Sequence, residues 1–384
     1  DSNATQVARH LRLNLTGSSG GASNLIVPTL ANGKNYYIKN SSNTSITVKT
    51  ASGSGIVVPT LKSVSLYQDG TNVVEAADFS TSYTINTLTT TNDAVINGLT
   101  VGKGANAVAT NTVLGDDALD AAVTGGSNVA VGYQSLTANT SGASNTAVGR
   151  ESLSANTTAN QNTAVGMYAL RQTSTGGNNV AMGYASLLTN TTGIGNVALG
   201  HNSLYASTTS SNNTALGTNA LVANTTGAAN TALGSGALDT NTTGATNTAV
   251  GYLSSFTNLS GTNNVSVGQR SLYSNTTADD NVAVGKESLY ANTTGTSNTA
   301  VGTNALAANT TGTNNVAIGE SAALAATTST GNVIIGQDAV KTGTFVGFNN
   351  VVIGKLAGED LTSADANVII GEDAGKNQTT ADNN

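Results

Sequence analysis

A glycine that recurs every seventeen residues constrains the fold of this chain more than any other feature. Counting from that glycine as position 0, an asparagine stands at −4 in all sixteen units and Thr or Val stands at −3. Position +3 is always Ala or Ser, and +4 is Leu in most units. Four columns held through so many units predict a stack of identical structural repeats. The glycines are Gly115, Gly132, Gly149, Gly166, Gly183, Gly200, Gly217, Gly234, Gly251, Gly268, Gly285, Gly302, Gly319, Gly336, Gly354 and Gly371.

A seventeen-residue unit is shorter than the helical repeats, which need about 33 residues, and suits one coil of a parallel β-solenoid. The alternating, β-branched segment from −3 to −1 predicts a strand, and the glycine after it a tight corner. We also expect a weaker second strand around the [AS]-L segment, and a turn at Asn-Thr-Thr-Gly. The predicted fold class is therefore all-β: a small N-terminal β-domain followed by a solenoid of sixteen coils.

Neighbouring coils place identical side chains above one another, so the asparagines at −4 are expected to form a hydrogen-bonded ladder. The apolar residues at −1 and the leucines at +4 are predicted to fill the coil. Alanine at −2 would then face outward, against another surface. Because so thin a core buries little apolar area, we expect three chains to pack as a homotrimer along this alanine stripe.

Three segments are predicted along the chain. Residues 1–78 form a small β-domain used for attachment or spacing, with short strands within 25–76 and a hairpin turn at Asp69-Gly70. Residues 79–110 form a connector, and residues 111–384 form the solenoid shaft. The last three coils carry larger residues at −2 and smaller ones at +4, which predicts a re-packed cross-section: Ile334, Val352 and Ile369 against Val340, Gly358 and Gly375.

Composition excludes several classes of protein. Only 9% of the residues are charged, the net charge is −7, and there is no cysteine. The lack of basic clusters argues against nucleic acid as a partner, and the short apolar runs argue against membrane insertion. The missing initiator Met indicates a mature product or a piece of a longer polypeptide.

No catalytic, cofactor-binding or metal site is predicted, and we expect a protein that is not an enzyme. Paired acids could serve glycoside hydrolysis, but none recurs at a repeat column, so solvated surface charge is the favoured interpretation. His201 lies at a variable surface position, and the Asp-rich calcium-binding repeat is missing. The acid pairs and histidines are Asp116-Asp117, Asp279-Asp280, Glu359-Asp360, His10 and His201.

Positions +1, +2 and the two after the loop glycine vary most. A receptor would touch the rod at these positions or at a tip beyond Asn384, although variation is equally expected of unconstrained surface. An ice-binding solenoid is a weaker alternative, because the −3 column holds seven Thr and nine Val. The variable residues include Tyr133, Arg150, Met167, Tyr184, Gln269 and Lys286.

The core of the repeat, as in NTAVGRES (145–152) and NVAIGESA (315–322), resembles the head repeat of YadA-like trimeric autotransporter adhesins. The resemblance implies a left-handed parallel β-roll with three chains. The longer unit ending in Asn-Thr-Thr-Gly looks more like repeats in bacteriophage tail fibres, and residues 25–76 resemble a small β-domain of phage virion proteins.

These resemblances imply a structural tail-fibre protein of the virion that is extracellular and works in host attachment. Its partners would be two further copies of itself, other tail proteins, and a host surface receptor such as a glycan or an outer-membrane component. The alternatives are the head of a bacterial trimeric adhesin and, less favoured, a polysaccharide-degrading tailspike.

Overall fold

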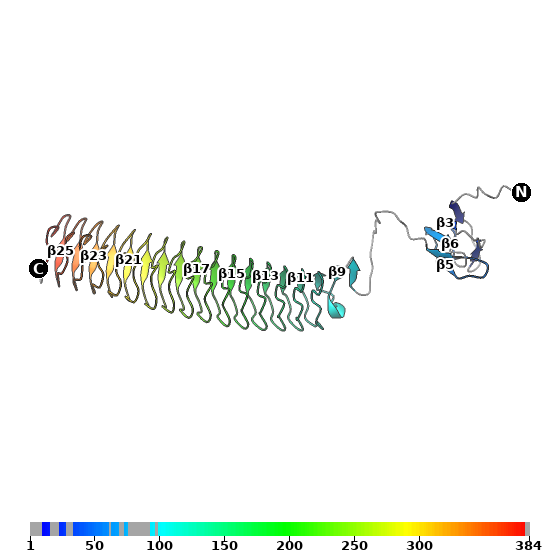
Figure 1. Cartoon of the computed structure of the whole chain (residues 1–384), viewed down its shortest axis with the longest axis horizontal. Coiled ribbons are helices and arrows are strands. Elements are labelled where there is room, and N and C mark those ends of the chain that lie inside the picture. Colours follow the sequence, from blue (N-terminus) through cyan, green and yellow to red (C-terminus); the bar gives the residue numbers. More distant parts are fainter. Residues whose placement is uncertain are drawn as a thin grey trace. The chain divides into compact units, whose positions relative to one another are not determined.

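The computed structural model describes residues 10–15, 23–27, 34–60, 63–68, 73–75, 93–96 and 99–380. The chain divides into two compact units, residues 1–89 and residues 90–384 (Figure 1). The described residues are almost entirely strand and turn, with one short 3₁₀ helix, η1 (Ala105–Ala107). The all-β prediction is confirmed.

The N-terminal unit contains two small sheets. One has the order β1-β3-β6-β7 and the other the order β2-β4-β5. The pairs β1/β3 and β2/β4 are parallel, and the remaining pairs are antiparallel. The strands are β1 (His10–Leu15), β2 (Ser23–Ile26), β3 (Lys34–Asn40), β4 (Ile46–Lys49), β5 (Gly55–Val58), β6 (Ser63–Gln68) and β7 (Val73–Glu75).

The inward positions of these strands form a compact apolar core, which includes Ile38, Val48 and Leu66. The alternation of apolar and polar residues in the sequence therefore correctly marked four of the strands. The predicted turn at Asp69-Gly70 lies outside the described residues.

The second unit is a parallel β-solenoid in which each coil contributes one strand of three residues (Figure 1). Each strand pairs in parallel with its neighbours, with every residue opposite its equivalent one repeat away, as in Thr214 opposite Thr231. The sixteen strands are β10 (Thr112–Leu114), β11 (Val129–Val131), β12 (Thr146–Val148), β13 (Thr163–Val165), β14 (Val180–Met182), β15 (Val197–Leu199), β16 (Thr214–Leu216), β17 (Thr231–Leu233), β18 (Thr248–Val250), β19 (Val265–Val267), β20 (Val282–Val284), β21 (Thr299–Val301), β22 (Val316–Ile318), β23 (Val333–Ile335), β24 (Val351–Ile353) and β25 (Val368–Ile370).

Two antiparallel strands cap the N-terminal end of the stack. β8 (Ala94–Ile96) pairs with β9 (Leu99–Gly102), and β9 pairs with β10. Both carboxylate oxygens of Asp93 accept hydrogen bonds, at 2.7 Å each, from the backbone N–H groups of Lys103 and Gly104. The cap covers the first solenoid strand, whose backbone would otherwise form an open edge.

The segment after each glycine is a turn, and the predicted second strand is wrong. Residues at +2 and +4 take the left-handed conformation in nearly every coil, as in Gln134 (φ 54°) and Leu136 (φ 52°). A strand needs an extended backbone at successive residues, so these two positions exclude one. The left-handed residues instead turn the chain and point the +4 side chain into the coil.

The repeat glycine is required for two reasons. Gly217 has a φ of 138°, where side chains are strained. A Cβ at this position would also lie 2.6 Å from the carbonyl oxygen of Gly234 in the next coil. The corner that the sequence predicted is thus also a place where the backbones of successive coils approach closely.

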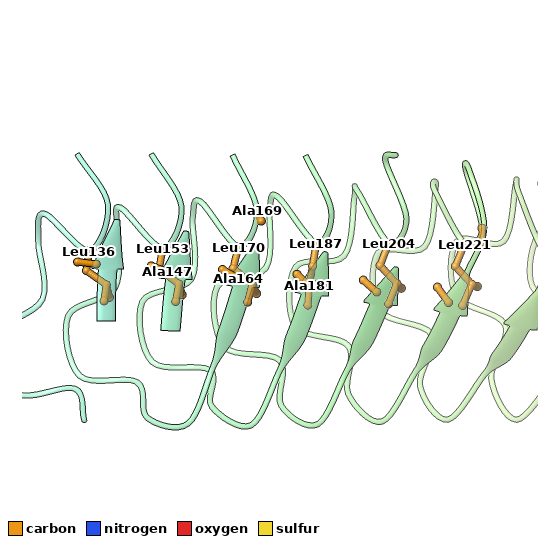
Figure 2. Packing of buried hydrophobic residues seen from close by; sticks show 14 of the residues in the cluster. Leu136, Ala147, Leu153, Ala164, Ala169, Leu170, Ala181, Leu187, Leu204 and Leu221 are labelled. Carbon is orange, nitrogen blue, oxygen red and sulfur yellow. The ribbon is translucent and has the colours of Figure 1, made fainter. Parts of the chain in front are cut away.

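The solenoid core is formed by alanine at −2 and leucine at +4, which face each other across the coil (Figure 2). Ala215 and Leu221, for example, both have no exposed surface. Leucine was predicted correctly. The assignments of −1 to the interior and of Ala −2 to the outer face are wrong, because the −2 side chains are buried with leucine +4 while those at −1 are partly or fully exposed.

Changes in one core column are matched by changes in the other. The buried Ser255 replaces leucine at +4, and its hydroxyl donates to that of Ser266, a buried serine at −2, at 2.8 Å. In the last coils Ile334 and Val352 replace alanine, and they are buried. The predicted re-packing is therefore present, and the 18-residue step places Phe345 fully inside the coil.

The predicted asparagine ladder runs the full length of the solenoid, and every asparagine at −4 is buried. The Oδ1 atom of Asn128 accepts the backbone N–H of Asn145 at 3.0 Å. Its Nδ2 atom donates to the carbonyl oxygens of Gly125 and Gly142, at 3.2 and 2.9 Å. One side chain thereby satisfies backbone groups in the turn just before it and in the following coil.

A second, shorter ladder is formed by asparagines at +7. Asn258, for example, donates to Asn241 Oδ1 at 2.8 Å and to the carbonyl oxygen of Gly261 at 3.1 Å. The ladder is interrupted where the next coil has another residue, and Asn309, which is followed by Ala326, keeps a buried Oδ1 without a hydrogen-bond partner. The +7 column is thus a weaker constraint than the −4 column.

We predict that Asn230→Ala destabilises the solenoid by about 2 kcal/mol, because it leaves a buried backbone group unpaired. The group is the N–H of Asn247, which donates to Asn230 Oδ1 at 2.9 Å. Thermal denaturation measures the loss of stability, and hydrogen exchange at Asn247 locates it in one coil. Thr231→Val, at an exposed position that is Val in nine other units, is the matched control. Equal melting temperatures for the two variants would contradict the prediction.

Candidate binding surfaces of the solenoid

The outer face of the solenoid sheet is a continuous apolar surface. The side chains at −1 are Val, Leu, Ile or Met in every coil, and those at −3 are Thr or Val. Both columns are partly or fully exposed, with Leu216 at 43% and Ile318 at 39%. A surface of this length without one charged side chain is typical of an interface. The sequence did not predict this surface, because the apolar residue at −1 was assigned to the interior of the coil.

The threonines of the Asn-Thr-Thr-Gly turn bond within the stack. At +8, the hydroxyl of Thr225 donates to the carbonyl oxygen of Thr242 at 3.0 Å, and Thr293 donates to Thr310 in the same way. Several such hydroxyls are therefore engaged between coils. The threonines at −3 lie on the outer face of the sheet, where they alternate irregularly with valine, and those at +9, such as Thr226, are exposed in the turn.

The acid pairs join coils to one another. Asp279 Oδ1 accepts the backbone N–H of Thr262 at 2.6 Å, and Glu359 forms an ion pair with Lys376 at 3.2 Å. Asp117 accepts a hydrogen bond from Gln134 at 3.3 Å. These contacts fit the interpretation of the acids as surface charge, and they add a role in holding neighbouring coils.

The two histidines lie far apart in the sequence. His10 begins β1 of the N-terminal unit. His201 is exposed at position +1, as expected, and its ring stacks on that of Tyr184 with the centroids 5.2 Å apart and the planes 12° apart. Tyr184 in turn makes an edge contact with Tyr168, at 5.9 Å between centroids.

An arginine–tyrosine cluster occupies the corner beside these rings. Glu151 binds two guanidinium groups, with Arg150 Nε at 3.2 Å and Arg171 Nη2 at 2.8 Å. The Arg171 guanidinium also lies over the ring of Tyr168, at 5.0 Å from its centroid. The sequence singled out Tyr133, Arg150 and Tyr184 but missed the rest, because Glu151, Tyr168 and Arg171 meet only when positions +2 and +5 of adjacent coils are superposed.

A second aromatic group lies at position +5. The rings of Phe256, Tyr273 and Tyr290 stack at 5.3 and 5.2 Å between centroids. Asp239 is the residue at +5 in the coil before Phe256, and it is partly buried. Burial of its carboxyl raises the pKa of Asp239 above the ordinary value.

Within the described ranges, no group of three His, Asp or Glu side chains is arranged to hold a metal ion. None of the helices described is long and apolar enough to cross a membrane. The structure thus brings no described acid or histidine into a metal-ligating set.

No protein-family model matches the chain, and no curated protein or solved structure matches it at a significant level. The solenoid of stacked coils is established by the structure. The resemblance to trimeric adhesins and to phage tail fibres stays a prediction from the repeat sequence.

We predict that Asp239→Asn stabilises the solenoid at neutral pH. The raised pKa of Asp239 means that its protonated form favours folding; that contribution is complete below the ordinary pKa, about 3.9, and is lost as the pH rises through the raised value. The melting temperature of the variant should therefore exceed that of the native chain at pH 7 and approach it at pH 3. Asp116→Asn, at an exposed corner, is the control. A constant difference at all pH values would contradict the assignment.

Proposed function

We propose that the chain is a structural protein of a bacteriophage tail, in which three copies form a rigid fibre shaft used for attachment to the host. The observation that carries the proposal is the uncharged sheet face formed by positions −3 and −1. Every outward residue at −1 is apolar along sixteen strands. Such a surface is unfavourable in water, and burial against two equivalent faces would remove it.

Rigidity is supported by the ladders. Parallel strands in register lie about 4.8 Å apart, so the sixteen strands extend over roughly 70 Å. Each coil is tied to the next by backbone pairing and by the buried asparagine at −4. A rod built in this way resists bending because any hinge would break several buried hydrogen bonds in one place.

The trimer is now proposed through the −3 and −1 face, since the alanines at −2 lie inside the coil. The head of a bacterial trimeric adhesin would use the same face for its trimer. The apolar sheet face therefore fits both the tail-fibre and the adhesin hypothesis. The phage assignment is favoured by the Asn-Thr-Thr-Gly units and by the N-terminal β-domain. None of the acid pairs recurs at a repeat column, so the polysaccharide-degrading tailspike is a weaker candidate.

We predict that the purified chain forms a trimer with three times the 38.0 kDa mass of one chain. Leu199→Lys, Leu216→Lys and Leu233→Lys combined, all at −1, should dissociate it, because charges would be buried without partners. Thr218→Lys, at an exposed +1 position two residues from Leu216, is the matched control and should leave the trimer intact. Light scattering measures the mass. A monomeric native chain would exclude the trimeric shaft.

Antibodies raised against residues 111–380 test where the protein works. We expect them to label the tails of phage particles in electron micrographs and to block attachment of those particles to cells. Labelling of a bacterial surface in the absence of phage would favour the adhesin and overturn the phage assignment.

A further inference from the structure

The arginine–tyrosine cluster is the only charged site along a long part of the shaft. Between Asp120 and Asp239 the sequence contains three charged residues, Arg150, Glu151 and Arg171. Glu151 forms an ion pair with each of the two arginines, and the surrounding coils are otherwise neutral. The cluster has a net positive charge on a chain whose net charge is −7. Unconstrained surface variation would not be expected to bring the only three charges of this stretch into one contact network.

The position of Glu151 makes the cluster a fixed site. The Glu151 side chain is only 11% exposed, and its two carboxylate oxygens each bind one arginine. The side chains of Arg150 and Arg171 are 55% and 45% exposed. Since each guanidinium carries five N–H donors and gives one of them to Glu151 at these distances, further donors of both are held at the surface. The acid therefore orients two cations toward solvent.

Aromatic side chains extend the site along the rod. Position +1 is occupied in five successive coils by large, exposed side chains, in contrast to the small residues that follow at Thr218 and Ser235. Five coils span about 19 Å at the spacing of parallel strands. The Arg150 guanidinium lies between the Tyr133 and Tyr168 rings, at 5.7 and 6.0 Å from their centroids. The five residues are Tyr133, Arg150, Met167, Tyr184 and His201.

We infer that the strip formed by these five side chains and the neighbouring Arg171 binds a carboxylate-bearing saccharide. Arg150 and Arg171 engage a carboxylate of the sugar, and the aromatic rings pack against its apolar C–H groups. The guanidinium group is planar and matches a carboxylate with two parallel hydrogen bonds. Tyrosine offers an apolar ring and a hydroxyl at one surface, which suits a sugar that is apolar on its faces and polar at its edge. The inference rests on the proposed role in host attachment and specifies the chemistry of the receptor.

Other classes of ligand fit the strip less well. Nucleic acid binding requires several phosphate contacts, and the site carries one net positive charge. A peptide that adds to a sheet needs a free strand edge, whereas the strands of these coils are paired on both sides. An exposed row of aromatic and basic side chains parallel to the rod is better suited to an extended saccharide.

The test measures binding of an oligogalacturonate to the purified full-length chain by isothermal titration calorimetry at low ionic strength. The methyl ester of the same oligosaccharide, which lacks the charge, is the ligand control. We expect binding of the acid, weaker binding of the ester, and a loss of affinity as salt is added. Equal affinity for acid and ester would overturn the inference, as would no binding of either.

The variant Arg150→Gln/Glu151→Gln/Arg171→Gln removes the cluster without leaving Glu151 buried and unpaired. We expect its affinity for the oligogalacturonate to fall by about tenfold or more, with an unchanged trimer and melting profile. Arg270→Gln/Glu287→Gln removes another arginine–glutamate contact, 3.9 Å in length, outside the strip and should bind as the native chain does. Retained binding by the triple variant would place the site elsewhere.

A second variant tests whether the aromatic ring of Tyr184 serves saccharide binding or only the stability of the rod. Tyr184→Ser exposes no buried charge and removes the ring on which His201 stacks. We expect a loss of affinity at an unchanged mass in light scattering. If the native chain forms a trimer but binds no saccharide, the saccharide inference is overturned and the shaft proposal stands. If the native chain binds the saccharide as a monomer, the shaft proposal is overturned and the binding site stands.

Discussion

The buried asparagine at −4 is the interaction on which the rest of the solenoid depends. A coil of seventeen residues contains one strand of three, so most of its backbone groups lie outside the strand ladder. The asparagine supplies an acceptor to the N–H of the coil on one side and donors to carbonyl oxygens at the turn. Because each side chain acts on the next coil, its benefit exists only when the repeat continues. The invariance of this column along the chain follows from that dependence.

The stack also carries a cost that each coil repeats. A leucine in the left-handed conformation is unfavourable by roughly 1–2 kcal/mol, and the described solenoid contains many of them at +4. Burial of the leucine against the alanines of its own coil and the adjacent ones offsets this cost. The left-handed φ and ψ of the leucine at +4 direct its side chain into the coil. The same two torsion angles therefore cause both the conformational penalty and the burial that offsets it.

Much of the fold could be predicted from the sequence because the information is periodic. The glycine spacing predicted the number of coils, and the asparagines at −4 predicted the hydrogen-bonded ladder. The leucines at +4 predicted one of the two columns that form the solenoid core. The other column could not be assigned from hydrophobicity. Alternation correctly places Ala −2 and its neighbour at −1 on opposite faces, but which face is inside depends on the width of the coil, and only the structure reveals that alanine fits opposite leucine.

The corner cluster shows a different limit. Tyr133, Arg150 and Tyr184 stand out as variable residues in a small-residue background, yet Glu151, Tyr168 and Arg171 look unremarkable in a linear sequence. Their contacts join positions +1, +2 and +5 of different coils, so the geometry of the turn must be known before they can be grouped. A search for charges separated by the repeat length plus a few residues would have found the pair Glu151 and Arg171.

The strict register has a consequence for how such a rod changes over generations. Each strand lies opposite its equivalent seventeen residues away, and a single inserted residue must be absorbed locally, as in the coil that contains Phe345. Whole units can be gained or lost while the strand pairing and the asparagine ladder continue, since both new neighbours present Asn at −4 and a strand from −3 to −1. The reach of the rod is therefore quantised in steps of about 4.8 Å, and unequal recombination between near-identical units would adjust it one step at a time.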